Sequence, residues 1–153
     1  MGRNKAVTLA MGTLVALGLV TSAWGSGSQN KTITLHTSSK LEHAGSVDNA
    51  PVGDSPGDRI FFTETLLDSS GRVIGHDAAD CVRLFDTRSE CTGTYSLAGG
   101  QVTVQLVQPS FSGTLTYTQA ITGGTGRYGG ASGTVTVHQS PSGDHSTFKI
   151  LMR

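Results

Sequence analysis

Candidate acid–base chemistry in this chain begins with Glu64, which stands in a stretch with the alternating pattern of a β-strand. In a strand, Glu64 shares one face with Phe62 and Leu66. A carboxyl group that faces the interior loses its hydration, which raises its pKa and lets it act as a proton donor or base. An outward Glu64 would be solvated, and the alternation alone does not choose between the two faces.

Asp77 and Asp80 lie in the next strand-like stretch, on opposite faces, so at most one of them points inward. His76 shares a face with Asp80, and Cys81 shares the face of Asp77. Either acid could be a pocket group, although a surface ion pair is the commoner role. Glu64 and Asp80 are our candidate catalytic residues.

Aromatic side chains supply candidate ligand contacts. Tyr95 and Tyr117 stand in the middle of strand-like stretches, where they could stack on a ligand or hydrogen-bond to it. Ordinary packing is the commoner role for such residues. Phe62, on the face of Glu64, is a third candidate.

A glycine-dense stretch covers residues 120–135, in which six of sixteen residues are glycine. Gly124, Gly126 and Gly129 fit the G-x-G-x-x-G pattern, but a dinucleotide site needs a helix next, and residues 134–138 alternate like a strand. A phosphate loop would need a Lys-Ser/Thr pair, which does not follow these glycines. The stretch therefore predicts a strand, a shaped loop and a second strand.

The elements that must position these residues are strands. Residues 26–153 contain no convincing apolar series at helical spacing, whereas Thr, Val, Ser and Gly abound and turn signals recur. We expect an all-β fold, an eight-stranded antiparallel barrel whose interior fits packed side chains or one small ligand. The expected strands are residues 32–38, 58–67, 73–85, 90–97, 101–108, 114–122, 133–139 and 146–152.

One expected connection is long. Residues 40–57 contain two prolines, three glycines and little apolar content, which predicts an exposed loop after the first strand. A loop over a barrel mouth can be a lid or merely a loop, and the sequence leaves both open.

The first 25 residues have the three parts of a secretory signal peptide. Arg3 and Lys5 precede an apolar run over residues 6–20, and small residues at Ala23 and Gly25 suit cleavage after Gly25. The run is about 15 residues, short of the roughly 20 that span a bilayer. We expect a secreted, extracellular protein with no stable membrane insertion after cleavage.

The near-neutral net charge argues against nucleic acids and anionic membranes as partners. The chain has 11 basic and 11 acidic residues, and loss of the leader removes two basic ones, which leaves a net charge near −2. Nucleic acids and anionic membranes select clustered Lys and Arg, so neither is an expected partner. Residues 26–153 form one expected domain, with the first strand and exposed loop in 26–57 and the rest of the barrel in 58–153.

Cys81 and Cys91 are the only cysteines. In an oxidising compartment an even count favours a disulfide, and a hairpin centred on Asp86 would place the two opposite each other. The alternatives are a redox pair or a metal site, but metal sites need more Cys or His ligands at close spacing. We predict a structural disulfide and no metal.

Four segments together resemble the allene oxide cyclase family and its relatives, the dirigent proteins. They are residues 61–75, Cys81, residues 102–105 and residues 120–135, in the order of the family motifs. The resemblance runs from about Asp58 to the end of the sequence, and the glycine-dense stretch is its most specific part.

The resemblance implies an eight-stranded antiparallel barrel with a largely apolar cavity. It also implies binding of a reactive hydrophobic small molecule, whose cyclisation or coupling the cavity controls without a metal or organic cofactor. Because dimers and trimers occur in these families, a homo-oligomer is a further expectation.

The same resemblance assigns residues. Glu64 takes the place of a polar pocket amide in the cyclase pattern, whereas residues 32–40 lack the cyclase's carboxylate and offer only His36. Gly129 and Ser132 replace the arginines of the dirigent motif. The loop is then expected to shape the barrel mouth without taking part in chemistry, through Gly123, Gly124, Gly126, Arg127 and Tyr128.

Three functions follow as hypotheses. The first is a cofactor-free isomerase or cyclase, the second a carrier that binds a hydrophobic compound without converting it, and the third a structural or surface-interaction barrel filled by its own side chains. An inward Glu64 or Asp80 beside an open cavity would favour the first.

Overall fold

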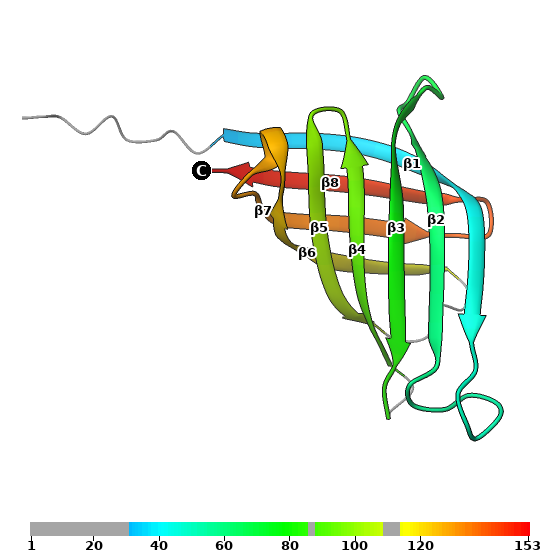
Figure 1. Cartoon of the computed structure of the whole chain (residues 1–153). Coiled ribbons are helices and arrows are strands. Elements are labelled where there is room, and N and C mark those ends of the chain that lie inside the picture. Colours follow the sequence, from blue (N-terminus) through cyan, green and yellow to red (C-terminus); the bar gives the residue numbers. More distant parts are fainter. Residues whose placement is uncertain (1–30, 86–87, 109–113) are drawn as a thin grey trace, which may run out of the picture.

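A computed structural model describes residues 31–85, 88–108 and 114–153, and it has eight antiparallel strands closed into one barrel (Figure 1). Each strand pairs with its neighbours in sequence, and β1 also pairs with β8. The strands are β1 (Lys31–Val47), β2 (Arg59–Leu67), β3 (Val73–Arg83), β4 (Ser89–Leu97), β5 (Gly100–Gln108), β6 (Leu115–Gly124), β7 (Ser132–Gln139) and β8 (Asp144–Met152).

The predicted eight-stranded antiparallel barrel is confirmed. The expected signal sequence over residues 1–25 lies outside the described residues, so that prediction and the domain boundary at residue 26 stay predictions. None of the helices in the described ranges is both long and apolar enough to pass through a bilayer.

The first strand is longer than expected, and the prediction of a loop over residues 40–57 was wrong: residues 40–47 belong to β1. Residues 31–39 of β1 pair with β8, and residues 38–47 pair with β2, with an irregularity between Leu41 and His43. The polar composition of this stretch suits an outer strand surface as well as a loop, which is why the sequence did not reveal it. The connection is therefore residues 48–58, in which Asp58 accepts backbone hydrogen bonds from Asn49 (2.9 Å) and Ser55 (2.7 Å).

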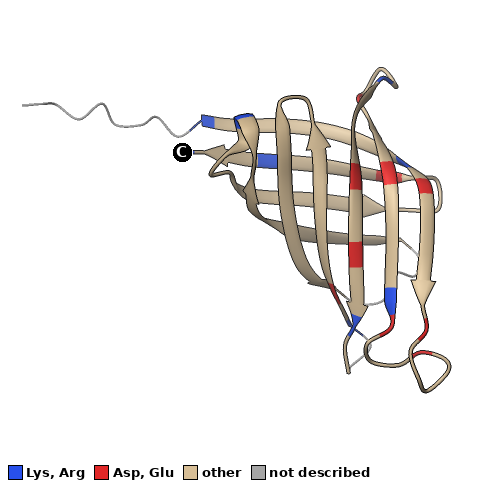
Figure 2. Ribbon diagram, in the orientation of Figure 1, with Lys and Arg blue, Asp and Glu red and all other residues tan. Residues whose placement is uncertain are grey.

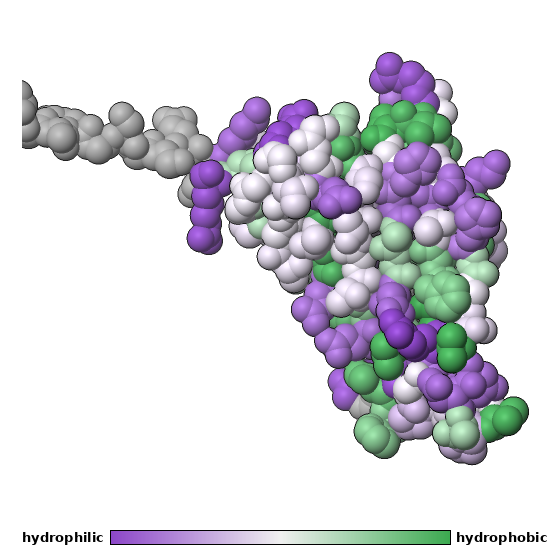
Figure 3. All heavy atoms as spheres, viewed as in Figure 1, coloured by the Kyte–Doolittle hydropathy of each residue, from purple (hydrophilic) through white to green (hydrophobic). Residues whose placement is uncertain are grey.

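Alternation along the strands places the core inside the barrel. Phe148, Ile150, Val102 and Val135 are fully buried, and Leu66 is 1% exposed. Outward positions carry mostly Thr, Gln and charged residues, and on the face in Figure 3 polar and apolar surface are interleaved. The burial of this inner set is the main stabilising term of the fold.

The connections between strands divide into two ends, because successive hairpins of a meander alternate. Residues 48–58 and 140–143 lie at one end, which we call the mouth end. Residues 68–72, 98–99 and 125–131 lie at the other, which we call the closed end.

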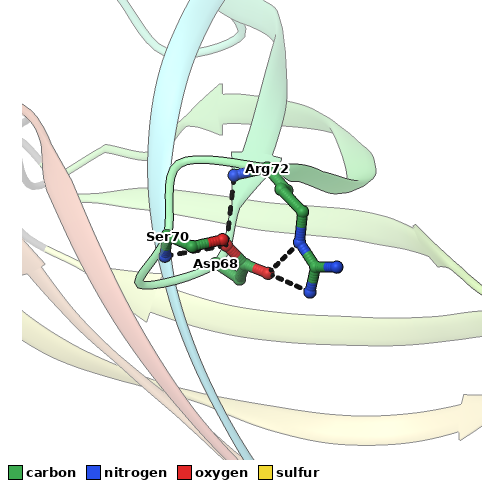
Figure 4. A network of polar contacts seen from close by, with 3 residues as sticks. All are labelled: Asp68, Ser70 and Arg72. Carbon is green, nitrogen blue, oxygen red and sulfur yellow. Dashed lines mark hydrogen bonds and ion pairs between the residues drawn. The ribbon is translucent and has the colours of Figure 1, made fainter.

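A tight polar turn joins β2 to β3 at the closed end (Figure 4). The carboxylate of Asp68 accepts hydrogen bonds from the backbone and hydroxyl of Ser70 and from the backbone and guanidinium of Arg72. These bonds hold the pKa of Asp68 well below its usual range. Gly71 supplies the left-handed conformation the turn requires, with φ of 78°.

The predicted disulfide is confirmed: Cys81 of β3 lies directly opposite Cys91 of β4, and the two sulfurs are bonded. Both residues are 3% exposed. The bond therefore ties β3 to β4 from inside the barrel, near the mouth end.

Replacing both cysteines by serine is expected to lower the free energy of unfolding by about 2–3 kcal/mol, since the bridge restricts the unfolded chain over 10 positions. For a domain of this size the midpoint of thermal unfolding should fall by roughly 10 °C. Calorimetry of the two forms checks this. An unchanged midpoint would show that the bridge contributes nothing to stability.

Candidate functional site

Two carboxyl groups meet inside the barrel. Glu64 on β2 is directly opposite Asp77 on β3, and both side chains face the interior. Directly opposed residues on neighbouring strands have Cβ atoms about 4.5–5.5 Å apart. A third acid, Asp144 at the start of β8, lies opposite Ser39 of β1 and faces the same space.

Glu64 and Asp144 line two neighbouring spaces at the mouth end, and Asp77 lines only the inner one. The inner cavity has a volume of about 30 Å³, room for roughly two water molecules. The mouth, between β1, β2 and the β7–β8 turn, has about 550 Å³, within the range of small-molecule sites. Five residues line both spaces: Ser39, Phe62, Glu64, Tyr117 and Asp144.

The mouth exists because β1 leaves β8 after Ser39 and continues along β2 alone. Leu41, Ala44 and Ile60 form an apolar wall on that side, and Pro141 of the β7–β8 turn faces them. A ligand could therefore place an apolar body in the mouth and a polar group at the acids.

Burial changes the proton affinity of all three acids. Desolvation, followed by the charge of Glu64, raises the pKa of Asp77 to about 7. Burial also raises the pKa of Glu64, against a hydrogen bond from Ser39 that lowers it, and burial raises the pKa of Asp144. At neutral pH, Asp77 therefore exchanges a proton readily, next to a second carboxyl group that can share it.

Two tyrosines stand beside the acids as hydroxyl donors. Tyr95 lies opposite Asp77 on β4 and donates a 2.8 Å hydrogen bond to Gln119, and its ring meets Phe148 edge-on at 4.8 Å. Tyr117 lines both spaces. Burial raises the pKa of both hydroxyls, so both stay protonated. The Tyr95 proton is donated to Gln119, and Tyr117 is the hydroxyl that can donate to charge developing on a ligand.

Gln108 faces the inner cavity from β5 and is 2% exposed. Neither the nitrogen nor the oxygen of its amide has a hydrogen-bond partner among the described residues, and the same holds for Oδ1 of Asp77. Buried polar groups in native proteins are nearly always paired. Polar atoms without a partner among the described residues therefore face the inner cavity, which has room for water.

Four of the predicted site residues come together here, and two do not. Phe62, Glu64, Tyr95 and Tyr117 line the inner cavity. His36 is on the outer surface, where its Nδ1 lies 3.1 Å from the hydroxyl of Thr147. Asp80 also faces outward and pairs with Arg59, and Asp77, on the opposite face of the strand, is the acid that enters the barrel.

The predicted mouth-shaping loop lies at the closed end. Gly123, Gly124, Gly126, Arg127 and Tyr128 line neither the inner cavity nor the mouth. The loop packs on the β4–β5 hairpin, where the backbone of Arg127 donates a 2.8 Å hydrogen bond to Gly99. Tyr128, 6% exposed, packs into the core from this end. The glycine loop thus closes the barrel opposite its opening.

A close backbone approach explains the glycines of this loop. Gly126 has φ of 58°, and a Cβ at this position would collide with the carbonyl oxygen of Gly99. A Cβ at Gly124 would lie 2.6 Å from the carbonyl oxygen of Tyr128. The loop therefore needs glycine to pack on the hairpin, without any ligand.

Replacing Arg127 by alanine is expected to leave ligand binding unchanged. The side chain is exposed, and its guanidinium lies 5.4 Å from the centre of the Tyr128 ring. Such an exposed contact contributes about 0.5–1 kcal/mol, so only a small loss of thermal stability should appear. Native mass spectrometry and thermal unfolding check both parts. Weaker binding by the variant would bring the loop into the ligand site.

Three further residues line the inner cavity but were not among the candidate site residues: Asp77, Asp144 and Gln108. Asp77 could be chosen over Asp80 only once it was known which face of β3 points into the barrel. Asp144 follows Pro141 in a stretch with the composition of an ordinary turn. Nothing in the sequence marked Gln108. Within residues 31–85, 88–108 and 114–153, no three His, Cys, Asp or Glu side chains are placed to hold a metal ion.

Most acidic residues visible in Figure 2 lie on β1, β2 and β3 and on the loops that join them. Neither the inner cavity nor the mouth has a Lys, Arg or His among its described lining residues. Among the described residues, the ionisable groups that line these two spaces are therefore three acids and two tyrosines, whereas Arg83, at the end of β3, lies outside both and pairs with Asp54.

Comparison with known proteins gives the same picture of the fold. The family model described as the allene oxide cyclase barrel like domain matches residues 36–151. No protein of curated function matches the sequence.

Several solved structures have the same barrel. A pyocyanin demethylase is 25% identical with a TM-score of 0.67, over 78% of this chain and 100% of that one. The Diels–Alderase AbmU from Streptomyces koyangensis is 16% identical with a TM-score of 0.67, over 80% of this chain and 64% of that one. A pterocarpan synthase dirigent protein is 17% identical with a TM-score of 0.57, over 80% of this chain and 84% of that one.

Proposed function

The chain belongs to the allene oxide cyclase barrel-like family, and from this premise we propose that it binds a hydrophobic small molecule and isomerises or cyclises it by proton transfer, without a cofactor. Residues 1–25 would direct the protein out of the cell before it acts. The ligand's apolar body occupies the mouth, and its reacting part meets the acids where the mouth joins the inner cavity.

The observation that carries this proposal is the opposed pair of Glu64 and Asp77. One of the two has a pKa of about 7, close to the pH at which a general acid or base works best. Glu64 lines both the inner cavity and the mouth, so it can contact a ligand that enters. A carboxylate displayed only for solubility would face water.

The proposed reaction moves a proton from one position of the ligand to another, with no net gain or loss of atoms or electrons. Glu64, as carboxylate, takes a proton from a carbon next to an electron-withdrawing group, and the electron pair moves into the conjugated system. Tyr117 donates a hydrogen bond to the oxygen that becomes negative. The proton returns at another carbon, or ring closure uses the electron pair and Asp77 supplies the proton elsewhere.

The relatives support a small organic ligand. Their printed names describe a demethylase acting on pyocyanin, a Diels–Alderase and a pterocarpan synthase. The mouth volume of about 550 Å³ suits a compound of that kind. Preformed walls would fix one conformer of a flexible ligand, which removes part of the entropic barrier.

The test is turnover of hydrophobic β,γ-unsaturated ketones, whose double bond moves into conjugation with a rise in ultraviolet absorbance. The protein should accelerate this shift, and Glu64→Gln should lower the rate by about 10²-fold, the usual contribution of a general base. Glu90→Gln is the matched control, because Glu90 is exposed on β4 and bonds Gln105 on the outer surface.

Binding without turnover, in every ketone of the panel, would contradict catalysis and identify a carrier. Absence of binding, with no compound retained through purification in native mass spectrometry, would contradict both and favour a structural barrel. Equal loss of activity in Glu64→Gln and Glu90→Gln would place the chemistry away from the inner acids.

A further inference from the structure

We propose that the ligand of this barrel carries a positive charge, held where the mouth meets the inner cavity by Glu64 and Asp144 and by the aromatic faces of Phe62 and Tyr117. This inference rests on the proposed binding site and names the class of compound it takes. An N-methylated aromatic ring or a protonated amine on an apolar body has the required chemistry.

Charge is the first step of the argument. The ionisable residues that line either space are three acids and two tyrosines, and no described lining residue is basic. An anionic ligand would meet like charges in a partly desolvated site, which raises its energy. A cation would meet opposite charges there.

Aromatic walls are the second step. Phe62 and Tyr117 line both spaces, together with Glu64 and Asp144. A cation is attracted to the negative face of an aromatic ring, and aromatic cages recognise quaternary ammonium groups. Ser39 is the only other described residue common to both linings.

An independent observation points to a ligand at this site. Gln108 is only 2% exposed and faces the inner cavity. Neither polar atom of its amide has a hydrogen-bond partner among the described residues. The inner cavity, about 30 Å³ in volume, has room only for a small polar substituent or for water. A cation at the junction with a small polar group directed inward would satisfy Gln108.

A metal ion is a poorer fit than an organic cation. In the part of the chain that the structure describes, no three His, Cys, Asp or Glu side chains converge as metal ligands do. Metal ions need several oxygen ligands at short distances. An organic cation needs only surrounding negative charge and aromatic faces.

Matched probes test the inference by calorimetry. 1-Methylquinolinium and 1-methylnaphthalene have the same shape and differ by one positive charge. We expect the cation to bind at least tenfold more tightly at pH 8. In Glu64→Gln this preference should fall at least threefold, whereas the outward control Glu90→Gln should keep it.

The preference should also weaken at pH 5, because Asp77, whose pKa burial raises to about 7, is then protonated and the site has lost negative charge. For the same reason, cation binding should release protons at pH 7. The groups that face the cation from the packed strands are Glu64, Asp77, Tyr95, Tyr117 and Asp144, with exposed His145 acting on Asp144. Proton release is measured as the dependence of the binding enthalpy on the buffer.

The outcomes are distinguishable. Equal affinity for the two probes overturns the charge preference and leaves the proposed binding of a hydrophobic molecule standing. Tighter binding of 1-methylnaphthalene overturns it in the same way. Failure of both probes to bind, with circular dichroism showing a folded barrel, overturns the inference and the proposed site together.

Discussion

Asp77→Asn is expected to stabilise the protein at pH 8 and to change its stability little at pH 4. Burial and the nearby Glu64 raise the pKa of Asp77 from 3.8 to about 7. A rise of this size corresponds to about 4 kcal/mol between the folded and unfolded states. Partial exposure of the carboxyl group reduces the expected gain to about 2–3 kcal/mol.

The sign follows from proton binding. Below about pH 4 the carboxyl group is protonated in both states and contributes no difference. Between pH 4 and 7 the unfolded chain loses this proton while folded Asp77 retains it, so stability falls as pH rises. Above pH 7 the full penalty is present, and Asn, which does not ionise, removes it.

Urea unfolding at pH 4, 6 and 8 measures this effect. Asp80→Asn is the matched control, because Asp80 lies on the same strand but faces outward and pairs with Arg59. The control should show no gain at pH 8. A gain for Asp77→Asn that is equal at pH 4 and pH 8 would contradict the raised proton affinity.

Retention of a destabilising acid in the barrel interior supports its use in function. Mutations that remove such strain commonly stabilise a protein and lower its activity. Stabilisation of Asp77→Asn together with loss of ketone isomerisation would fit that pattern.

Phe148→Ala is expected to lower the free energy of unfolding by about 3–5 kcal/mol, the range for a large aromatic residue removed from a core. Phe148 is fully buried on β8, and its neighbours in the ladder are Leu35 and Val135. Its ring also supports Tyr95 edge-on. The variant should therefore lose both packing and the fixed position of the Tyr95 hydroxyl.

Thermal unfolding and near-ultraviolet circular dichroism check this prediction. The midpoint should fall by 10 °C or more, by the usual relation for domains of this size. Phe85→Ala is the control, since Phe85 is 94% exposed and should change stability by less than about 0.5 kcal/mol. Similar losses in the two variants would show that Phe148 is not part of a tightly packed core.

The barrel and its disulfide could be predicted from the sequence, because alternation and turn residues are local signals. Four of the six candidate site residues named from the sequence line the inner cavity. The choice between Asp77 and Asp80 could not, since a strand's facing depends on which neighbour covers it. The inward face became known only with Glu64 opposite Asp77 in the sheet. Asp144 enters the site because the barrel closes, which no local pattern reports.

The sequence of the glycine loop also could not predict which end of the barrel the loop occupies. Its residues correctly predicted a shaped corner between two strands, as β6 and β7 now show. Which end of the barrel is open depends on where β1 separates from β8, at Ser39. That separation lies about 80 residues before the loop, so the loop sequence carries no information about it.

The double pairing of β1 also affects how the barrel folds. The hairpins from β2 to β8 can form between neighbours in sequence, but closure joins residues far apart in the chain, such as His36 and Thr147, 111 positions apart. Such long-range contacts carry a large loop-closure entropy and slow folding. Until they form, β1 and β8 both present unpaired edges, which are sites for pairing with other chains. The strand that opens the mouth in the folded protein is thus also the one whose late docking exposes the chain to aggregation.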